Sequence, residues 1–160
     1  MAVDMFLKIE GIKGESQDDA HKDEIDVLAW SWGMSQSGTT HMGGGGGAGK
    51  VNVQDISVTK YVDKASPNLM VYCCNGKHIP TMNLTVRKAG ENALEYLKMT
   101  MKDGLISAVS TGGSGGEDRL TENVSLNFAH VKVEYTPQKA DGSGDAAVEM
   151  AWDITKNVKG

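Results

Sequence analysis

The sequence predicts a mainly β protein, an antiparallel two-sheet β-barrel that carries one short α-helix. Three observations favour this class. Most apolar segments alternate with polar residues at the two-residue period of a strand, turn-forming residues separate them, and only one segment has helix signals. At 160 residues we expect a single domain over residues 1–160, because two domains would each have a marginal core.

The N-terminal part contains three predicted strands. Residues 2–10 alternate apolar and polar side chains, with Phe6 as an extra ring on the polar side. In residues 24–36 large side chains alternate with small ones, which favours a strand with its bulk on one face. Residues 51–63, rich in Val, Thr and Tyr, are the third strand. We interpret the large side chains of the second strand as core, which is the usual role of such a stripe: Leu28, Trp30, Trp32 and Met34.

One helix is expected over residues 66–75. Ser66 is a suitable N-cap, Pro67 fits the first helical position, and Gly76 stands where a glycine ends many helices. A helix of this length is unstable alone, so we expect it to dock on the sheet.

The C-terminal part contributes four further strands. The apolar alternation predicts them around 82–86, over 96–101 continued by 105–109, over 120–135 and over 148–154. In the strand over 120–135 the apolar phase changes near Ala129. Such a change indicates a bulge, or a strand that passes from one sheet to another.

Composition and charge argue against several classes of function. The net charge is −5 and no long basic run occurs, so we expect no nucleic-acid partner. Because no apolar stretch approaches about 18 residues and the N-terminus lacks a signal-peptide pattern, we expect no membrane insertion and no cleaved signal. Adjacent Cys73 and Cys74 cannot supply a spaced metal site, and no metal or cofactor is expected.

The apolar content is low for a chain of this length. Leu, Ile, Val and Phe together make up 32 of the 160 residues, near the composition at which chains become disordered. A thin core is tolerable when contacts between subunits bury further apolar area.

Two loops hold much of the glycine. Seven of the 20 glycines lie within residues 38–49 and four within 112–116. A run of five glycines has no side chain to anchor it, so we expect the loop 38–50 to be mobile in a free monomer.

Both loops match catalytic motifs whose context is wrong. Residues 44–50 match G-x-x-x-x-G-K, but Val51 replaces the magnesium-binding Ser or Thr, and a strand follows instead of a helix. Residues 112–116 match G-x-S-x-G, yet a strand again follows and the chain order of acid and histidine is unsuitable. We therefore expect no enzyme; a nucleotide hydrolase that uses the lysine of the first motif is the least favoured alternative.

Several collinear segments carry a family signature. They are IDVLAWSWGMSQ at 25–36, RKAG at 87–90, TENVSLNFA at 121–129 and YTPQ at 135–138. With the opening MAVDMF and both glycine loops, the chain over essentially residues 1–160 resembles the Hcp family, the haemolysin-coregulated proteins of bacterial type VI secretion.

The resemblance implies a structural and transport function without catalysis. Family members form a two-sheet barrel with a helix alongside, six copies close into a ring, and rings stack into the inner tube of a contractile apparatus. The implied partners are further copies of the chain, the VgrG spike, the sheath and baseplate, and small effector toxins held in the ring lumen. The protein would be made in the bacterial cytoplasm and exported to the extracellular space or a target cell.

For a tube subunit of this kind we further expect a role for each of the two glycine-rich loops. The loop 38–50 would mediate ring stacking, through Thr40, His41, Gly43, Gly44, Gly45, Gly46, Gly47 and Lys50. The loop 110–118 would face the lumen and contact effectors through Gly113, Ser114 and Gly115. The alternative from another class is a monomeric β-barrel module that binds a small ligand on its tryptophan stripe.

Overall fold

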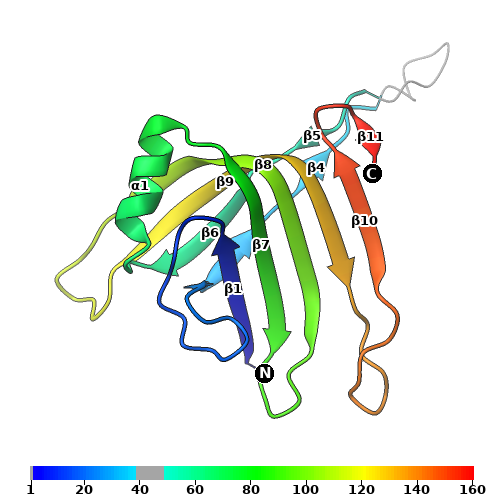
Figure 1. Ribbon diagram of the computed structural model, residues 1–160, viewed down its shortest axis with the longest axis horizontal. Helices are drawn as coiled ribbons and strands as arrows, with labels where there is room; N and C mark the ends of the chain where they lie inside the picture. The colour runs from blue at the N-terminus through cyan, green and yellow to red at the C-terminus, as the bar shows by residue number, and fades with distance from the viewer. Residues whose placement is uncertain (1, 39–48) are drawn as a thin grey trace.

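A computed structural model describes residues 2–38 and 49–160 and is mainly β, with one helix in these ranges (Figure 1). In chain order the elements are β1 (Val3–Ile9), β2 (Ile25–Asp26), β3 (Ala29–Ser31), β4 (Met34–Ser35), β5 (Asn52–Val53), β6 (Ile56–Tyr61), α1 (Ser66–Asn75), β7 (Ile79–Lys88), β8 (Glu95–Thr111), β9 (Thr121–Tyr135), β10 (Val148–Asp153) and β11 (Val158–Lys159).

The described strands form two antiparallel sheets. The larger has nine strands, in the order β11-β10-β9-β8-β7-β1-β2, with β6 also paired to β9 and β3 to β6. The smaller consists of β4 and β5. This confirms the predicted class, mainly β with two antiparallel sheets and a single short helix beside them.

The barrel is not closed, which corrects the predicted architecture. The large sheet curls, but it ends at β2 on one side and at β11 on the other (Figure 1). The segment predicted as one strand over 24–36 is divided into β2, β3 and β4. The physical reason is that its inward-facing side changes, from Ile25 and Val27 to Trp30 and Trp32. A segment that changes face cannot remain in one continuous ladder and seal the sheet.

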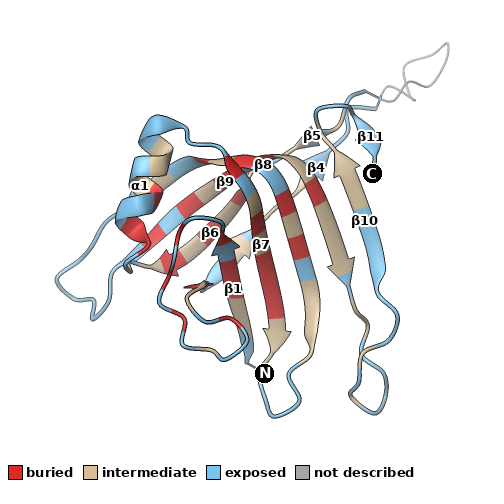
Figure 2. Ribbon diagram, in the orientation of Figure 1, coloured by how far each residue is buried: buried red, intermediate tan, exposed pale blue. Residues whose placement is uncertain are grey.

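The core lies along the inner face of the curled sheet (Figure 2). Buried positions alternate along β6 and along the first half of β9, as predicted. The tryptophan stripe was only partly a core feature. Trp30 and Trp32 pack partly buried against the core, whereas Leu28 is 41% and Met34 is 45% exposed.

The predicted change of phase in β9 is confirmed and coincides with a change of partner. Val124, Leu126 and Phe128 are buried at even positions, and Val131 is buried after the change. The strand pairs with β6 over 121–126 and with β10 over 130–135, while β8 pairs along both halves. β9 therefore belongs both to the part of the sheet that includes β6 and to the open edge that includes β10.

Helix α1 has the predicted bounds, but its first turn is held differently from the prediction. Ala65 is the N-cap residue and gives no side-chain cap. The Ser66 hydroxyl instead accepts a hydrogen bond from the Asp63 N–H at 3.0 Å and donates one to Glu122 Oε1 at 2.5 Å. Gly76 ends the helix at a φ of 61°, in the left-handed conformation that glycine tolerates. No helix in the described part of the chain is both long and apolar enough to cross a membrane.

A buried polar network fastens this first turn to the sheet. Lys60 on β6 is fully buried, and its ammonium donates to Asp63 Oδ1 at 2.9 Å, to Ser66 Oγ at 3.2 Å and to Glu122 Oε1 on β9. Glu122 is 1% exposed. A buried charge is tolerated only when it is paired and hydrogen-bonded, so these four side chains depend on one another.

Removing the Glu122 carboxylate should destabilise the protein strongly. In Glu122→Ala the Lys60 ammonium stays buried with Asp63 as its remaining charged partner, and we expect the free energy of unfolding to fall by about 3 kcal/mol. Urea denaturation at equal protein concentration measures it. The matched control is Glu149→Ala, whose exposed ion pair with Lys132 spans 3.6 Å and should contribute about 1 kcal/mol or less. Equal losses in the two variants would contradict the role of the network.

Candidate interaction surfaces

The described part of the loop 38–50 is its base. Thr40, His41 and Gly43 to Gly47 lie outside the described residues. At the base, the Gly49 N–H donates to the Ser37 carbonyl at 3.2 Å, so the two ends of the loop meet. Lys50 is exposed and is followed by β5, so the helix that a phosphate-binding loop requires does not follow it.

Ser114 lies in the exposed connection between β8 and β9. Its hydroxyl accepts a hydrogen bond from the Gly116 N–H at 3.4 Å, and its carbonyl accepts one from the Glu117 N–H at 3.1 Å. The connection borders an open hollow of about 350 Å³ lined by Ser110, Thr111, Gly112, Gly113, Ser114, Glu117, Thr121 and Asn123. The chain then enters β9 and not a helix, so the structural context of a nucleophile elbow is missing.

Three of the four glycines of this connection are not required by the fold of one chain, whereas a Cβ on Gly113 would lie 2.5 Å from the Leu120 side chain. Gly112, Gly115 and Gly116 have no positive φ, and a Cβ built on each would meet nothing within 4 Å. By contrast, a Cβ on Gly104 would lie 2.5 Å from the Asn127 carbonyl oxygen. The small size of the three loop residues therefore serves either the freedom of the backbone or contact with a surface outside the chain.

A second surface is the apolar inner face of β7, β8, β9 and β10. The strand registers align apolar side chains across the four strands in three rows: Val86, Leu97, Tyr135 and Val148; Leu84, Met99, Val133 and Met150; Met82, Met101, Val131 and Trp152. We call these the apolar rows.

The apolar rows are covered at β7 and uncovered at β10 (Figure 2). Leu84 and Met99 are 1% exposed, whereas Met150 in the same row is 36% exposed. Tyr135 and Val148 are 48% and 65% exposed. Sheets normally turn their apolar face to a packed layer, so the β10 end of this face lacks a covering layer within the described chain.

An apolar hollow adjoins the uncovered rows. It has a volume of about 220 Å³ and lies between the β4–β5 sheet and the β9–β10 edge, lined by Trp32, Met34, Val51, Val53, Val131, Met150 and Trp152. All of these side chains are apolar apart from the two indole N–H groups. The rows and the hollow thus form one apolar surface at the open edge of the sheet.

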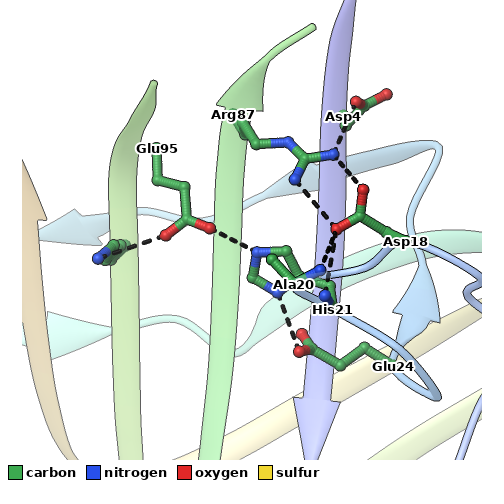
Figure 3. Close-up of polar contacts among 8 residues, drawn as sticks. Asp4, Asp18, Ala20, His21, Glu24, Arg87 and Glu95 are labelled. Atoms are coloured by element: carbon green, nitrogen blue, oxygen red, sulfur yellow. Dashed lines mark hydrogen bonds and ion pairs between the residues drawn. The ribbon is translucent and has the colours of Figure 1, made fainter. Parts of the chain in front are cut away.

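A polar cluster occupies the opposite, outer face of the sheet (Figure 3). It is made by the connection between β1 and β2, residues 10–24, which we call the strap. Arg87 on β7 holds the strap residue Asp18 through Nη2 at 2.6 Å and Nη1 at 3.0 Å, and its Nη2 also donates to Asp4 at 3.2 Å. The guanidinium hydrogen bonds lower the pKa of Asp18, and those carboxylates in turn raise the pKa of Arg87.

His21 anchors the strap to two further strands. Its ring stacks on Phe6 of β1, with centroids 4.4 Å apart and planes 11° from parallel. Nδ1 lies 2.9 Å from Glu24 Oε2, and Nε2 lies 2.6 Å from Glu95 Oε1 on β8. Burial alone would lower the pKa of His21, but hydrogen bonds and charge from Glu95 and Glu24 outweigh it and raise the pKa. Burial would raise the pKa of Glu95, and His21 and Lys98 lower it.

The strap cluster and the openness of the apolar rows have no clear signal in the sequence. No sequence motif singles out His21, because its partners Glu24 and Glu95 lie 3 and 74 positions away. The one local sign was Phe6, an apolar ring on the polar side of the first strand. In the described ranges no group of three or more His, Cys, Asp or Glu side chains is placed to hold a metal ion.

Comparison with known proteins identifies the relatives of this chain. Residues 6–135 match the family model described as "Type VI secretion system effector, Hcp". The chain is 68% identical over 161 residues to the protein named hcp1 of Pseudomonas aeruginosa, covering 99% of both. Among solved structures it resembles Hcp1 from Salmonella typhimurium, with a TM-score of 0.81, 41% identity and 99% of both chains covered. It also resembles a type six secretion system protein with a TM-score of 0.93, 29% identity, and 99% of this chain and 100% of that one covered.

Proposed function

Because the chain belongs to the Hcp family of type VI secretion proteins, we propose that it is a subunit of the inner tube of that apparatus. Six copies close into a ring, the rings stack into a tube, and the lumen carries small effector proteins during export. In this role the protein is structural and catalyses no reaction.

The observation that supports self-assembly is the uncovered β10 end of the apolar rows. Fully burying one exposed Val or Met side chain contributes about 1.5–3 kcal/mol, and several such side chains lie together there. A contact between this edge and a different face of the next copy is head-to-tail, and it closes into a ring when the rotation permits. The low apolar content of the chain fits a subunit that completes its core against a neighbour.

We assign ring stacking to the loop 38–50 and effector contact to Gly113, Ser114 and Gly115. A glycine run can exchange its conformational freedom for contacts made only in the stack. Support for the second assignment comes from Gly115, where the single chain has no steric need for glycine, and from the open hollow beside Ser114. The further partners are the VgrG spike, the sheath and the baseplate.

The alternative is a monomeric module that binds a small apolar ligand. The apolar hollow lined in part by Trp32 and Trp152 favours it. Light scattering separates the two functions, because the module has the mass of one chain, 17.1 kDa, and the ring has about six times that mass.

A charge at the β10 edge should prevent ring formation. In Val148→Asp a carboxylate would have to be buried between subunits, which is unfavourable without a partner, while the monomer tolerates it because Val148 is 65% exposed. We expect sedimentation velocity to show the mass of a single chain. The control is Val71→Asp on α1, 54% exposed, which should leave the ring intact. A Val148→Asp ring of unchanged mass would exclude this edge as the interface.

Deleting residues 43–47 should separate ring formation from stacking. We expect rings of normal mass but no tubes in negative-stain images, because the contacts between rings are lost and those within a ring remain. The control is a variant in which two of the five glycines become serine, which keeps the length and much of the flexibility. Tubes of normal length in the deletion variant would remove the stacking role.

A bulky side chain at Ser114 should reduce effector retention without affecting the ring. We expect Ser114→Trp to lower the amount of effector that co-purifies with the ring by about tenfold, comparable to the loss of one well-packed contact. Ser143→Trp, at an exposed serine of the β9–β10 connection, is the matched control. Effector levels equal in both variants would exclude a lumen contact at Ser114.

A further inference from the structure

We propose that the strap, residues 10–24, is a pH-sensitive latch that is closed while His21 is protonated and loosens when His21 loses its proton. The part of the strap around His21 lies on the outer face of the sheet, opposite the apolar rows. It is independent of the assembly role proposed above.

The geometry around the His21 ring requires a charged imidazole. Both ring nitrogens lie within hydrogen-bond distance of a carboxylate oxygen, at 2.9 Å for Glu24 and 2.6 Å for Glu95 (Figure 3). An ionised carboxylate only accepts hydrogen bonds, and a neutral imidazole has a single N–H to donate. An imidazolium has two N–H groups and can donate one hydrogen bond to each carboxylate. After deprotonation one nitrogen faces a carboxylate with no hydrogen between them, so the strap loses either its internal contact or its anchor on β8.

The other charged groups around His21 do not replace it as the titrating contact between the strap and β8. The hollow beside the ring, about 250 Å³ in volume, is lined by charged side chains from the strap, β1, β8 and β9: Glu24, Lys8, Glu95, Lys98 and Glu134. Lys98 lies 3.4 Å from Glu95 and can take over this carboxylate when His21 is neutral. On the β7 side, Arg87 binds Asp18 and Asp4 and carries its charge at every pH of interest.

Arg87 also defines which part of the strap moves. Its paired hydrogen bonds to Asp18 do not depend on the protonation of His21, and Asp18 further accepts hydrogen bonds from the backbone of Ala20 and His21 at 3.1 Å. Near His21 the strap is held on β7 by Arg87 at every pH and on β8 by His21, which titrates. Elsewhere Glu15 accepts a hydrogen bond from the Lys64 N–H at 2.7 Å and Ile12 packs in the core, so only the part around His21 loosens. Loosening at His21 uncovers Phe6, which is 4% exposed and lies outside the main core cluster.

The direction in which the latch responds to pH follows from the contacts that stabilise the protonated form of His21. Because the contacts raise the pKa of His21 above its ordinary value of 6.5, the latch is fully closed below that pH. It loosens as the pH rises through the raised pKa. The pKa of Glu95 is lowered, so Glu95 stays ionised throughout this range and the change is that of the histidine.

Hydrogen exchange with mass spectrometry on the purified full chain tests the latch. Peptides from residues 10–24 are followed from about pH 5 to about pH 9, with rates corrected for intrinsic exchange and compared with peptides from β8 and β9. We expect the protection of the strap amides against exchange in the wild-type protein to fall by about tenfold as the pH rises. A fall of this size corresponds to the loss of one charge-assisted hydrogen bond. Constant relative protection of the strap over this range would overturn the proposal.

Three variants distinguish His21 from other titrating groups. His21→Gln should remove the pH dependence, and Glu95→Gln should move its midpoint to lower pH. His78→Gln is the control, since this exposed histidine pairs with Asp103 at 3.1 Å and not with a strap residue, and it should leave the wild-type profile unchanged. A midpoint that does not move in Glu95→Gln, or a pH dependence that persists in His21→Gln, would overturn the latch. If His21→Gln does not fold, the wild-type and Glu95→Gln profiles still decide.

Discussion

The pairing of β8 with β9 is the constraint on which the rest of the structure depends. The ladder extends from Leu97 opposite Tyr135 to Thr111 opposite Glu122. Antiparallel strands of this length twist, and the register shift between Ile106 and Ala108 adds a local bend. The resulting curl brings β6 onto the first half of β9 and leaves the second half to β10. The uncovered β10 end of the apolar rows is a consequence of that division.

The two halves of β9 differ in what covers them. Where β9 pairs with β6, the apolar face is closed and even a lysine is buried, because Glu122 and its neighbours satisfy the charge. Where β9 pairs with β10, the apolar rows end at exposed side chains. On the outer face the strap is held largely by ionisable groups around one stacked ring. At the β10 edge the inner face therefore depends on apolar contact that pH does not change, whereas the contact of the strap with β8 depends on the charge of His21, which pH does change.

Much of the fold was predictable because local pattern determines it. The alternation along β1, β6, β7 and β9 needs only a period of two, and the end of α1 needs only a glycine that can adopt a positive φ. The division of residues 24–36 was not predictable, because Ile25 pairs with β1 and Trp30 pairs with β6. The role of Ser66 was also hidden, since its partner Glu122 lies 56 positions away. Among the candidate interaction surfaces, composition indicated the two glycine-rich loops. The strap and the uncovered end of the apolar rows could be recognised only in the three-dimensional structure.

The sequence by itself determined the family, the strands, the single helix and the position of both glycine-rich loops. These features follow from residue type and spacing within short windows. Only the tertiary structure decided which apolar faces are covered, which charges are paired and where the sheet stays open. The reason is that burial and ion pairing depend on contacts between residues far apart in the sequence, such as His21 and Glu95 at 74 positions apart. The periodicity of a short sequence window does not reveal such contacts.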